Sequence, residues 1–477
     1  MKVAIVHYHL EPGGVTRVIE NTIQAWREDN VAVETVVLSG RKYSGSILER
    51  TATVEGLDYA NASDCPDPQI LAERLEKAAL EVLGSSPDVW HFHNHSLGKN
   101  PALTSAVSIL SKKGNFILLH PHDFAEDGRP GNFRNLGSHY AGAYPIGPRI
   151  HYAALNHRDL SFLQVMLGEH SHSHLLANSI PESGEILSNE SYPDLPENLY
   201  LYPVRAVRRK NLGELALLSM LFPEKHFANS LGPTNPNFQK EFDLWKSFAE
   251  KFSLNLTYGL GSKSKASFPQ MVNHAEAIIT TSVAEGFGLG FLEPWTFGKG
   301  LCGRNLPEIT TDFANQGICL DNLYDQLEVN LDLLDDVEEL SYTVAQELES
   351  FYASYQIATP PTAVAEAKEG LLGNGKVDFG KINEKFQRQI LSRLASDANQ
   401  RLELRDLVSL QIPNKETLSS NRIAVKQEFS QTAYGDRLYS IYQKILSADS
   451  AEITFADGKV LLNQFLSPKR LNLLRTT

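Results

Sequence analysis

The feature that most constrains the fold is a repeated alternation of short apolar runs with stretches of helical periodicity. Val3 to Tyr8 reads as a buried strand, a turn through Gly13 and Gly14 follows, and Val15 to Trp26 has helical periodicity. Strands that alternate with helices form parallel sheets, whose ligands bind beyond the carboxyl ends of the strands. The same half of the chain contains further predicted strands at 31–38, 89–93 and 116–120 and predicted helices at 70–83 and 102–110.

The second half repeats this pattern after a segment that is typical of an exposed linker. Residues 181–198 are rich in Pro, Ser, Glu and Asp and contain no Lys or Arg. At 477 residues the chain is too long for one hydrophobic core. We therefore predict two α/β domains, each with a parallel sheet, that face a cleft. The strands predicted in the second domain are 199–204, 228–231, 254–260, 277–280 and 300–303.

Beyond Tyr324 the pattern is mostly helical and predicts no further α/β unit. Residues 381–408 form a candidate amphipathic helix, which either packs on one domain or contacts another subunit. A later helix is predicted from apolar side chains at helical spacing between Tyr434 and Ile445. The predicted organisation is an N-terminal domain at 1–180, a second domain at 199–330, a helical extension at 331–420, and a tail at 448–477 whose structure the sequence does not indicate.

The net charge and the lengths of the apolar stretches exclude several kinds of binding partner and location. A formal net charge of −13 argues against nucleic acid and against broad adhesion to anionic lipid. No apolar stretch approaches the roughly 20 residues that span a bilayer, and the four apolar residues Val3 to Val6 are too few for a signal-peptide core. We therefore expect a cytoplasmic protein. Cys65, Cys302 and Cys319 are widely spaced, so we interpret them as packing residues.

Gly13 and Gly14 lie between a predicted strand and a predicted helix. The first amides of that helix and the positive end of its dipole would face the ligand side of the sheet. Without side chains, these glycines allow a phosphate or a sugar to approach the backbone closely. The alternative is an ordinary tight turn, and the segment does not match the G-x-G-x-x-G dinucleotide pattern.

Arg205 and Lys210 follow the first predicted strand of the second domain, within a run of basic residues. A guanidinium and an ammonium can stabilise the charge that develops on a nucleotide diphosphate leaving group without a metal ion. The alternative is a solvated basic loop.

The segment from Glu285 to Glu293 contains glycines at positions 286, 288 and 290, whose amides can bind hydroxyls and phosphates. Glu285 can accept hydrogen bonds from sugar hydroxyls, and Glu293 can accept two from a ribose. The alternative is a pair of helix-capping glutamates beside a glycine turn. This segment is the most specific of the three signals.

Histidines recur with H-x-H spacing in the first domain. His91, His93 and His95 alternate along a predicted strand and would point to one face, and His120 and His122 repeat the spacing. Some metal-dependent hydrolases present imidazoles to zinc in this way. Such enzymes need further ligands on later strands of a closed barrel, and the interdomain linker argues against a barrel.

Taken together, these segments give the chain a resemblance to the retaining, two-domain glycosyltransferases of GT-B type called family 4, or group 1. The resemblance extends from the N-terminus to about Asn322 and resumes from Arg422 to Leu446, whereas residues 330–420 depart from the family. The matching segments are His9-Leu-Glu-Pro-Gly-Gly-Val-Thr16, Pro87-Asp-Val-Trp-His-Phe-His93, Leu119-His-Pro-His-Asp123, Arg205 with Lys210, and the E-x7-E segment.

The resemblance implies roles for these residues. Gly13 and Gly14 would lie against the donor phosphates or the acceptor, Arg205 and Lys210 would neutralise the diphosphate, and Glu293 would hold the ribose. Residues 421–447 would be closing helices that cross back to the first domain. The transferred sugar would contact Glu285 and the amides of Phe287, Gly288 and Leu289, and the reacting sugar would meet His122 with Asp123 beside it.

The predicted function is transfer of a hexose, with retention, from a UDP-, GDP- or ADP-sugar to a hydroxyl group of a small, soluble acceptor. No cofactor and no metal ion are predicted, because the chain has no D-x-D triplet. On the acceptor side we expect His95, Lys99, Arg129 and Arg134, and either arginine would meet an acidic group of the acceptor. The alternatives are a metal-dependent hydrolase, a non-catalytic nucleotide-sugar-binding protein and a sugar-nucleotide epimerase. The sequence indicates neither the donor nor the oligomeric state.

Overall fold

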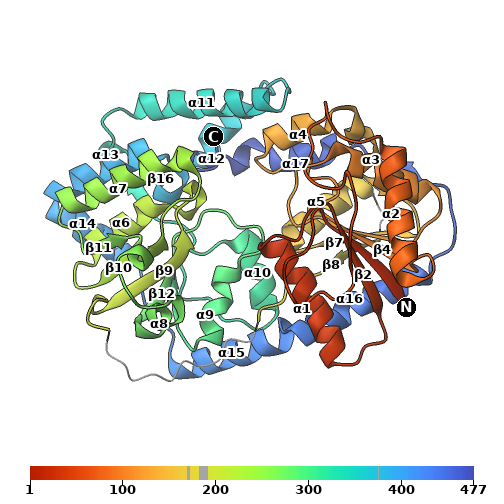
Figure 1. Ribbon diagram of the computed structural model, residues 1–477. Coiled ribbons are helices and arrows are strands. Elements are labelled where there is room, and N and C mark those ends of the chain that lie inside the picture. Colours follow the sequence, from red (N-terminus) through yellow and green to blue (C-terminus); the bar gives the residue numbers. More distant parts are fainter. Residues whose placement is uncertain (169–171, 182–191, 374, 477) are drawn as a thin grey trace. The chain divides into compact units, whose positions relative to one another are not determined.

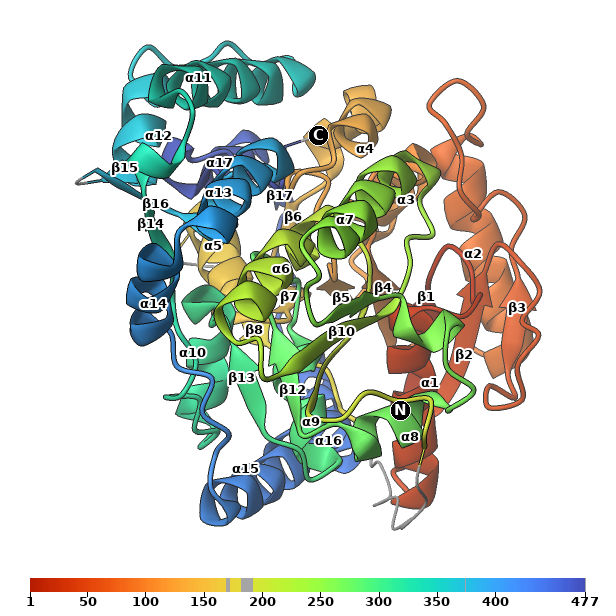
Figure 2. The same ribbon diagram turned by 90° about the vertical axis from the view of Figure 1, so that its left-hand side faces the viewer.

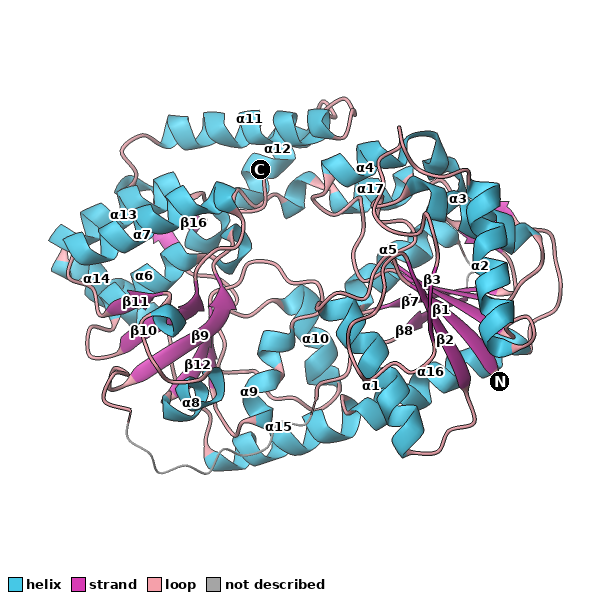
Figure 3. Ribbon diagram, viewed as in Figure 1, coloured by secondary structure: helices cyan, strands magenta, loops and turns pink. Residues whose placement is uncertain are grey.

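The computed structural model describes residues 1–168, 172–181, 192–373 and 375–476, and the chain divides into two compact units. Unit 1 comprises residues 1–181 and 428–466, and unit 2 comprises residues 182–427 and 467–477. Each unit contains a parallel sheet flanked by helices (Figure 3). The prediction of two α/β domains with parallel sheets is therefore confirmed. The predicted linker lies mainly outside the described residues.

Unit 1 is built on a seven-stranded sheet in the order β3-β2-β1-β4-β5-β7-β8, and all its pairs are parallel. The strand order reverses between β1 and β4, which is where ligands bind in sheets of this kind. The strands are β1 Lys2–Val6, β2 Glu34–Ser39, β3 Thr51–Thr53, β4 Val89–His93, β5 Ile117–His120, β7 Ile150–Ala154 and β8 His172–Leu175. The sequence pattern did not predict β7 and β8, because polar His151, His172 and His174 interrupt their apolar runs.

Helices cover both faces of this sheet (Figure 1). One face packs on α2, α3, α5 and α17, and the other packs on α1 and α16. Trp26 of α1 donates from its indole nitrogen to the carbonyl of Gly435 in α16, 3.1 Å away. The helices are α1 Gly14–Glu28, α2 Pro68–Leu83, α3 Pro101–Lys112, α4 Pro130–Leu136, α5 His157–Leu167, α16 Gln431–Leu446 and α17 Lys459–Phe465.

Unit 2 has a five-stranded parallel sheet in the order β11-β10-β9-β12-β13. Its strand order reverses between β9 and β12. Figure 2 shows α6 beside β10, and α7 contacts β11. The strands are β9 Leu199–Arg205, β10 His226–Leu231, β11 Leu256–Tyr258, β12 Ala277–Thr280 and β13 Leu301–Gly303. The helices are α6 Leu212–Leu221, α7 Gln239–Lys251, α8 Phe268–His274, α9 Glu293–Thr296 and α10 Pro307–Asn315.

The extension after Tyr324 is mostly helical, as predicted, but it differs from the prediction in two places. A small antiparallel sheet forms in the order β14-β16-β15. The helix predicted over 381–408 is two helices, because Asp397 is extended and its carboxylate caps the amides of Asn399 and Gln400. The elements are β14 Glu328–Asn330, β15 Leu372–Gly373, β16 Lys376–Asp378, α11 Val337–Ser354, α12 Ala363–Leu371, α13 Glu384–Ser396, α14 Ala398–Leu407 and α15 Lys415–Glu428.

The tail belongs to both units. Strand β17, Thr454–Phe455, pairs with β6, Pro145–Ile146, and α17 packs on α5 within unit 1. The last residues join unit 2, where Arg470 forms a bidentate ion pair with Glu308 at 2.6 and 3.1 Å. Among the described residues, no helix is both long and apolar enough to cross a membrane.

Candidate active site

A cavity of about 510 Å³ opens in unit 1 beyond the carboxyl ends of β1 and β4. It therefore lies where the strand order reverses, which is the expected ligand position. The Tyr8 hydroxyl donates to the carbonyl of Asn94 at 2.7 Å and ties together the loops that leave the two strands. Residues that line the cavity include His7, Gly13, Gly14, Tyr59, Lys99, Asp123 and Arg129.

The diglycine turn presents the amino end of α1 to this cavity. Gly13 is extended and provides no side-chain cap, and the first turn of α1 contains no acidic residue. A Cβ atom at Gly14 would meet no atom within 4 Å, so the space in front of the turn is open. The Thr16 hydroxyl fixes the turn by donating to the carbonyl of Glu11 at 2.7 Å. Uncapped amides and the helix dipole make this end of α1 suitable for an anion.

Two cationic side chains stand beside the turn. The ammonium of Lys99 lies 5.1 Å from the ring centroid of Tyr59. Arg129 forms an ion pair with Asp123 at 2.5 Å and donates to the carbonyls of Phe124 and Asp127 at 3.2 and 3.0 Å. Lys99 and Arg129 thus line the cavity with Gly13 and Gly14.

Two of the predicted acceptor-side residues lie elsewhere. Arg134 is exposed in the last turn of α4 and does not line the cavity. His95 is fully buried, and its Nε2 lies 2.8 Å from the carbonyl of Ala143. It does not share the face of His91 and His93, because Asn94, with φ of 56°, ends the alternation of the strand.

His122 and Asp123 are held at the end of β5 by Asn94, whose side-chain oxygen accepts from both of their amides at 2.7 and 3.1 Å. The Nε2 of His122 lies 2.8 Å from Nδ1 of His93. Burial, followed by the neighbouring imidazoles, lowers the pKa of His122 well below its usual value. His122 is therefore neutral at pH 7 and can accept or donate a hydrogen bond.

In unit 2, three of the predicted donor residues, Lys210, Glu285 and Glu293, converge where β9 and β12 end. Lys210 lies in the short 3-10 helix Arg208–Lys210 after β9 and forms an ion pair with Glu285, which follows β12. The Ser282 hydroxyl donates to the same carboxylate at 2.6 Å. Burial raises the pKa of Glu293, the first residue of α9, and the charge of Lys210 opposes that rise. Lys210 therefore acts electrostatically on Glu293 as well as pairing with Glu285.

The segment between Glu285 and Glu293 has a backbone conformation that requires glycine at position 288. Gly288 has φ of 93°, and a Cβ atom there would lie 3.0 Å from Ile309. Phe287 anchors the segment by packing edge-on against Phe313, with ring centroids 5.6 Å apart. Leu289 begins a 3-10 turn and is exposed.

Arg205 ends β9, and its guanidinium lies at hydrogen-bond range, 3.5 Å, from the Thr234 hydroxyl. It is exposed, whereas Arg208 of the same basic run is structural. Arg208 donates to both carboxylate oxygens of Glu384 at 2.9 and 3.0 Å, and it also bonds the carbonyls of Leu473 and Thr476. The sequence carries no signal for this role, because its partners lie 176 and more residues away.

A buried ionic network lies behind the Lys210 loop. Arg304 pairs with Glu214 at 2.6 Å and with Asp378 at 2.7 Å, and all three side chains are less than a tenth exposed. Asn211, next to Lys210, donates to Glu214 at 2.8 Å and accepts from Gln387 at 2.8 Å. The network fastens the loop to residues of the extension, and sequence reasoning did not identify it.

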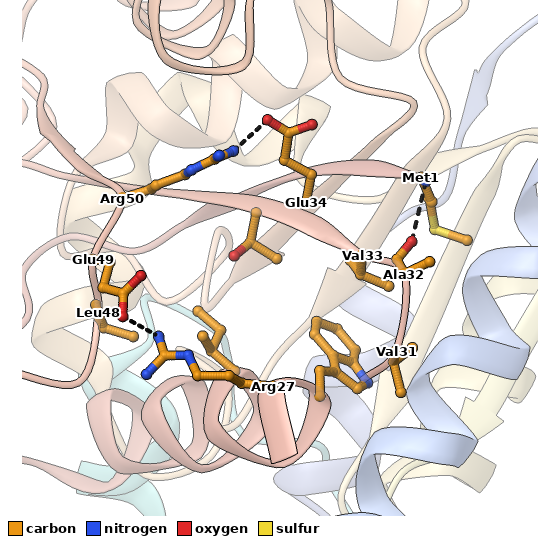
Figure 4. Close-up of a pocket in the computed structure, with 12 residues that line it drawn as sticks. Met1, Arg27, Val31, Ala32, Val33, Glu34, Leu48, Glu49 and Arg50 are labelled. Carbon is orange, nitrogen blue, oxygen red and sulfur yellow. Dashed lines mark hydrogen bonds and ion pairs between the residues drawn. The ribbon is translucent and has the colours of Figure 1, made fainter. Parts of the chain in front are cut away.

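A second cavity, of about 530 Å³, lies in unit 1 at the amino ends of β1 and β2 (Figure 4). Its arginines are paired, Arg27 with Glu49 at 3.2 Å and Arg50 with Glu34. Ligands of parallel sheets bind at the opposite ends of the strands. We therefore place the site at the first cavity.

Comparisons with known proteins support the fold. No family profile matches the sequence. The curated mannosylglucosyl-3-phosphoglycerate synthase of Petrotoga mobilis is 26% identical over 342 residues, which cover 65% of this chain and 66% of that protein, just under two thirds of its length.

Solved structures share the architecture at low sequence identity. The Anabaena HepE structure in complex with UDP-glucose has a TM-score of 0.51 at 11% identity and covers 93% of this chain and 99% of that one. Sucrose-phosphate synthase of Thermosynechococcus elongatus has a TM-score of 0.51 at 13% identity, with 94% and 99% covered. A glycosyltransferase of Rickettsia africae has a TM-score of 0.52 at 13% identity, with 94% and 98% covered. The chain thus has the two-domain α/β fold of the GT-B glycosyltransferases, as its sequence predicted.

Proposed function

We propose that this chain is a retaining, metal-independent glycosyltransferase that moves a hexose from a nucleotide diphosphate sugar to a hydroxyl group of a small, anionic acceptor. The observation that carries the proposal is the convergence of Lys210, Glu285 and Glu293 at the reversal of strand order in unit 2. The GT-B fold and the sequence similarity to a sugar-phosphoglycerate synthase add support.

On the donor side, Lys210 and Arg205 would stabilise the charge of the leaving diphosphate, so no divalent ion is needed to bridge its phosphates. Glu293 would accept hydrogen bonds from the ribose hydroxyls. The diphosphate would compete with Glu285 for Lys210, which frees this carboxylate to bind hydroxyls of the hexose together with the amides of Phe287, Gly288 and Leu289.

On the acceptor side, the cavity of unit 1 offers the uncapped amino end of α1 beside Lys99 and Arg129. This combination favours a phosphate or a carboxylate. The relative from Petrotoga mobilis is named for a phosphoglycerate product, which agrees with an acceptor of this chemistry. Neutral His122 would orient the reacting hydroxyl, and an oxygen of the leaving phosphate would take its proton as the new bond forms on the same face of the sugar.

The donor assignment is tested by thermal-shift measurements with UDP, GDP, ADP and their hexose derivatives. A ligand at 100 times its dissociation constant stabilises a fold by about 2.7 kcal/mol. We expect Glu293→Ala to remove most of the shift that the preferred nucleotide produces. The control is Glu328→Ala, an exposed glutamate of unit 2 paired with Lys376. If both variants keep the full shift, the ribose role of Glu293 is wrong.

Turnover is tested by measuring hexose transfer to glycosides of phosphoglycerate, with the anomeric configuration of the product read by NMR. Lys99→Ala should raise the KM for an anionic acceptor about tenfold, corresponding to 1.4 kcal/mol, with slow donor hydrolysis unchanged. Lys42→Ala, an exposed lysine outside the cavity, serves as the control. An inverted product would exclude the retaining mechanism, and a nucleotide shift without any donor turnover would favour a non-catalytic binding protein.

A further inference from the structure

Unit 1 gathers several histidines on one face of its sheet. His91 and His93 belong to β4, and His120 ends β5. In the register of the sheet His93 pairs with His120, and His91 lies two residues before His93, so the three side chains share a face. All three are buried, with at most 1% of their surface exposed. The proposed sugar transfer uses none of them directly.

The ring nitrogens of these three histidines lie close enough together for small side-chain movements to bring them onto one ion. One nitrogen from each residue lies within 4.8 Å of those of the other two. The Nε2 of His91 and Nδ1 of His120 are 3.2 Å apart. Two nitrogens bound to one tetrahedral zinc ion at about 2.0 to 2.1 Å would be roughly 3.3 Å apart. The spacing between the two residues therefore suits a shared ion as well as it suits a hydrogen bond.

Hydrogen bonds leave the cluster incomplete. His120 can bond His91 through Nδ1, but its Nε2 is buried and has no hydrogen-bond partner among the described residues. Buried polar atoms are rarely left without a partner. An ion shared with His91 would bind Nδ1 of His120, the nitrogen that faces His91, and Nε2 of His120 would then carry the proton.

The outer nitrogens of two of the rings have the partners that metal ligands require. The Nδ1 of His91 lies 2.8 Å from the Tyr442 hydroxyl, and Nδ1 of His93 lies 2.8 Å from Nε2 of His122. A ligating histidine usually donates its second ring N–H to a neighbour, which fixes the tautomer and the orientation of the ring. Tyr442 and His122 are placed to accept such bonds.

We propose that His91, His93 and His120 bind one transition-metal ion of the zinc class. Neutral imidazoles suit zinc, and three protein nitrogens leave a fourth coordination position open. An ion bound to Nε2 of His93 leaves the proton of this ring on Nδ1. The Nδ1–H of His93 then donates to Nε2 of His122, so the proton of neutral His122 is on its own Nδ1. The bound ion would in this way fix the tautomer of His122. The inference does not depend on the proposed sugar transfer.

The test is the metal content of the full-length protein, purified without a histidine tag, supplied with zinc and then dialysed. We expect one zinc ion per chain in the wild type and little in His91→Asn or His120→Asn. The matched control is His151→Asn, which removes a histidine of the same sheet whose Nδ1 lies 2.8 Å from Nε2 of His174. This control should retain the full content.

Replacing zinc by cobalt gives an independent measurement, because a tetrahedral cobalt site absorbs visible light. The band should appear in the wild type and in His151→Asn and be lost in the other two variants, with circular dichroism showing that all of them fold. A folded wild type that retains no zinc and shows no cobalt band would overturn the proposal. So would a metal content that survives in the His91→Asn/His120→Asn double variant, because the ion would then bind elsewhere.

Discussion

Units 1 and 2 both bury polar side chains near the carboxyl ends of strands of their parallel sheets, but the two groups differ in charge. Unit 1 buries imidazoles, and burial lowers the pKa of His120 to about 3 and that of His7 to about 3, so these rings are neutral at pH 7. Unit 2 buries full charges, the guanidinium of Arg304 between the carboxylates of Glu214 and Asp378. A neutral cluster can exchange protons or accept an ion, whereas a paired cluster holds a loop in one place.

The largest expected effect comes from breaking the charged network of unit 2. Arg304→Leu leaves Glu214 and Asp378 buried without their partner, and removing one member of a buried ion pair costs about 3–5 kcal/mol. Urea denaturation should show this loss of stability. Arg393→Leu removes the exposed pair with Asp335 and should cost no more than about 1 kcal/mol. Similar losses in the two variants would mean that the buried network does not stabilise unit 2.

An effect of intermediate size is expected in the pH dependence of stability, which should differ between unit 1 and unit 2. Burial is the main reason that the pKa of His151 is lowered to about 3 and that of His174 to about 4, and neighbouring charged side chains add to both shifts. Unfolded histidine titrates near pH 6.5, so protons favour the unfolded state, and the contribution of these rings to stability is complete above pH 6.5 and is lost as the pH falls towards 4.

Within the charged network of unit 2, burial raises the pKa of Glu214, whereas Asp378 should respond at lower pH. Burial alone would raise the pKa of Asp378, but pairing with Arg304 lowers it overall, so this carboxylate loses its contribution only below its usual value of 3.8. Hydrogen exchange followed by mass spectrometry between pH 7 and 4 should therefore show earlier loss of protection in β7 and β8, which carry His151 and His174, than in β16, which carries Asp378. The opposite order would contradict the assignment of charge states.

The smallest effect concerns two helical glycines, Gly213 and Gly435, each of which packs against side chains from a distant part of the sequence. A Cβ atom at Gly213 of α6 would collide with the Gln387 amide and lie 2.7 Å from Trp245. Such overpacking costs about 1–3 kcal/mol. At Gly435 of α16 the nearest atom of Trp26 would be 3.1 Å away, and the helix propensity of alanine, better than that of glycine by about 1 kcal/mol, should offset much of the crowding.

Thermal melts of Gly213→Ala and Gly435→Ala test this difference. A lower Tm for Gly213→Ala and a nearly unchanged Tm for Gly435→Ala are expected. If Gly435→Ala is the more damaging change, then α16 tolerates less displacement on α1 than α13 does on α6.

Local sequence patterns were sufficient to predict many of the strands and helices and some of the residues of the candidate site. Apolar runs predicted β4 and β12 closely, and the glycine turn was correctly placed between β1 and α1. The spacing of the basic residues after β9 could not show that Arg208 has a structural role. Its partner Glu384 belongs to the extension, which is distant in sequence and packs on the β9 loop only in the folded protein. Arg134 and His95, near Arg129 and Lys99 in sequence, do not line the cavity, because Arg134 lies in the last turn of α4 and Asn94 ends the alternation of β4 before His95.

The sequence by itself determined which segments become strands and helices and which loops carry glycine, because hydrophobic periodicity and turn residues act over a few neighbours. Only the tertiary structure decided which polar side chains meet. Lys210 pairs with Glu285 across 75 residues, and His91 lies against Tyr442 across 351. Such contacts depend on the order and register of strands in a sheet, which local pattern does not encode.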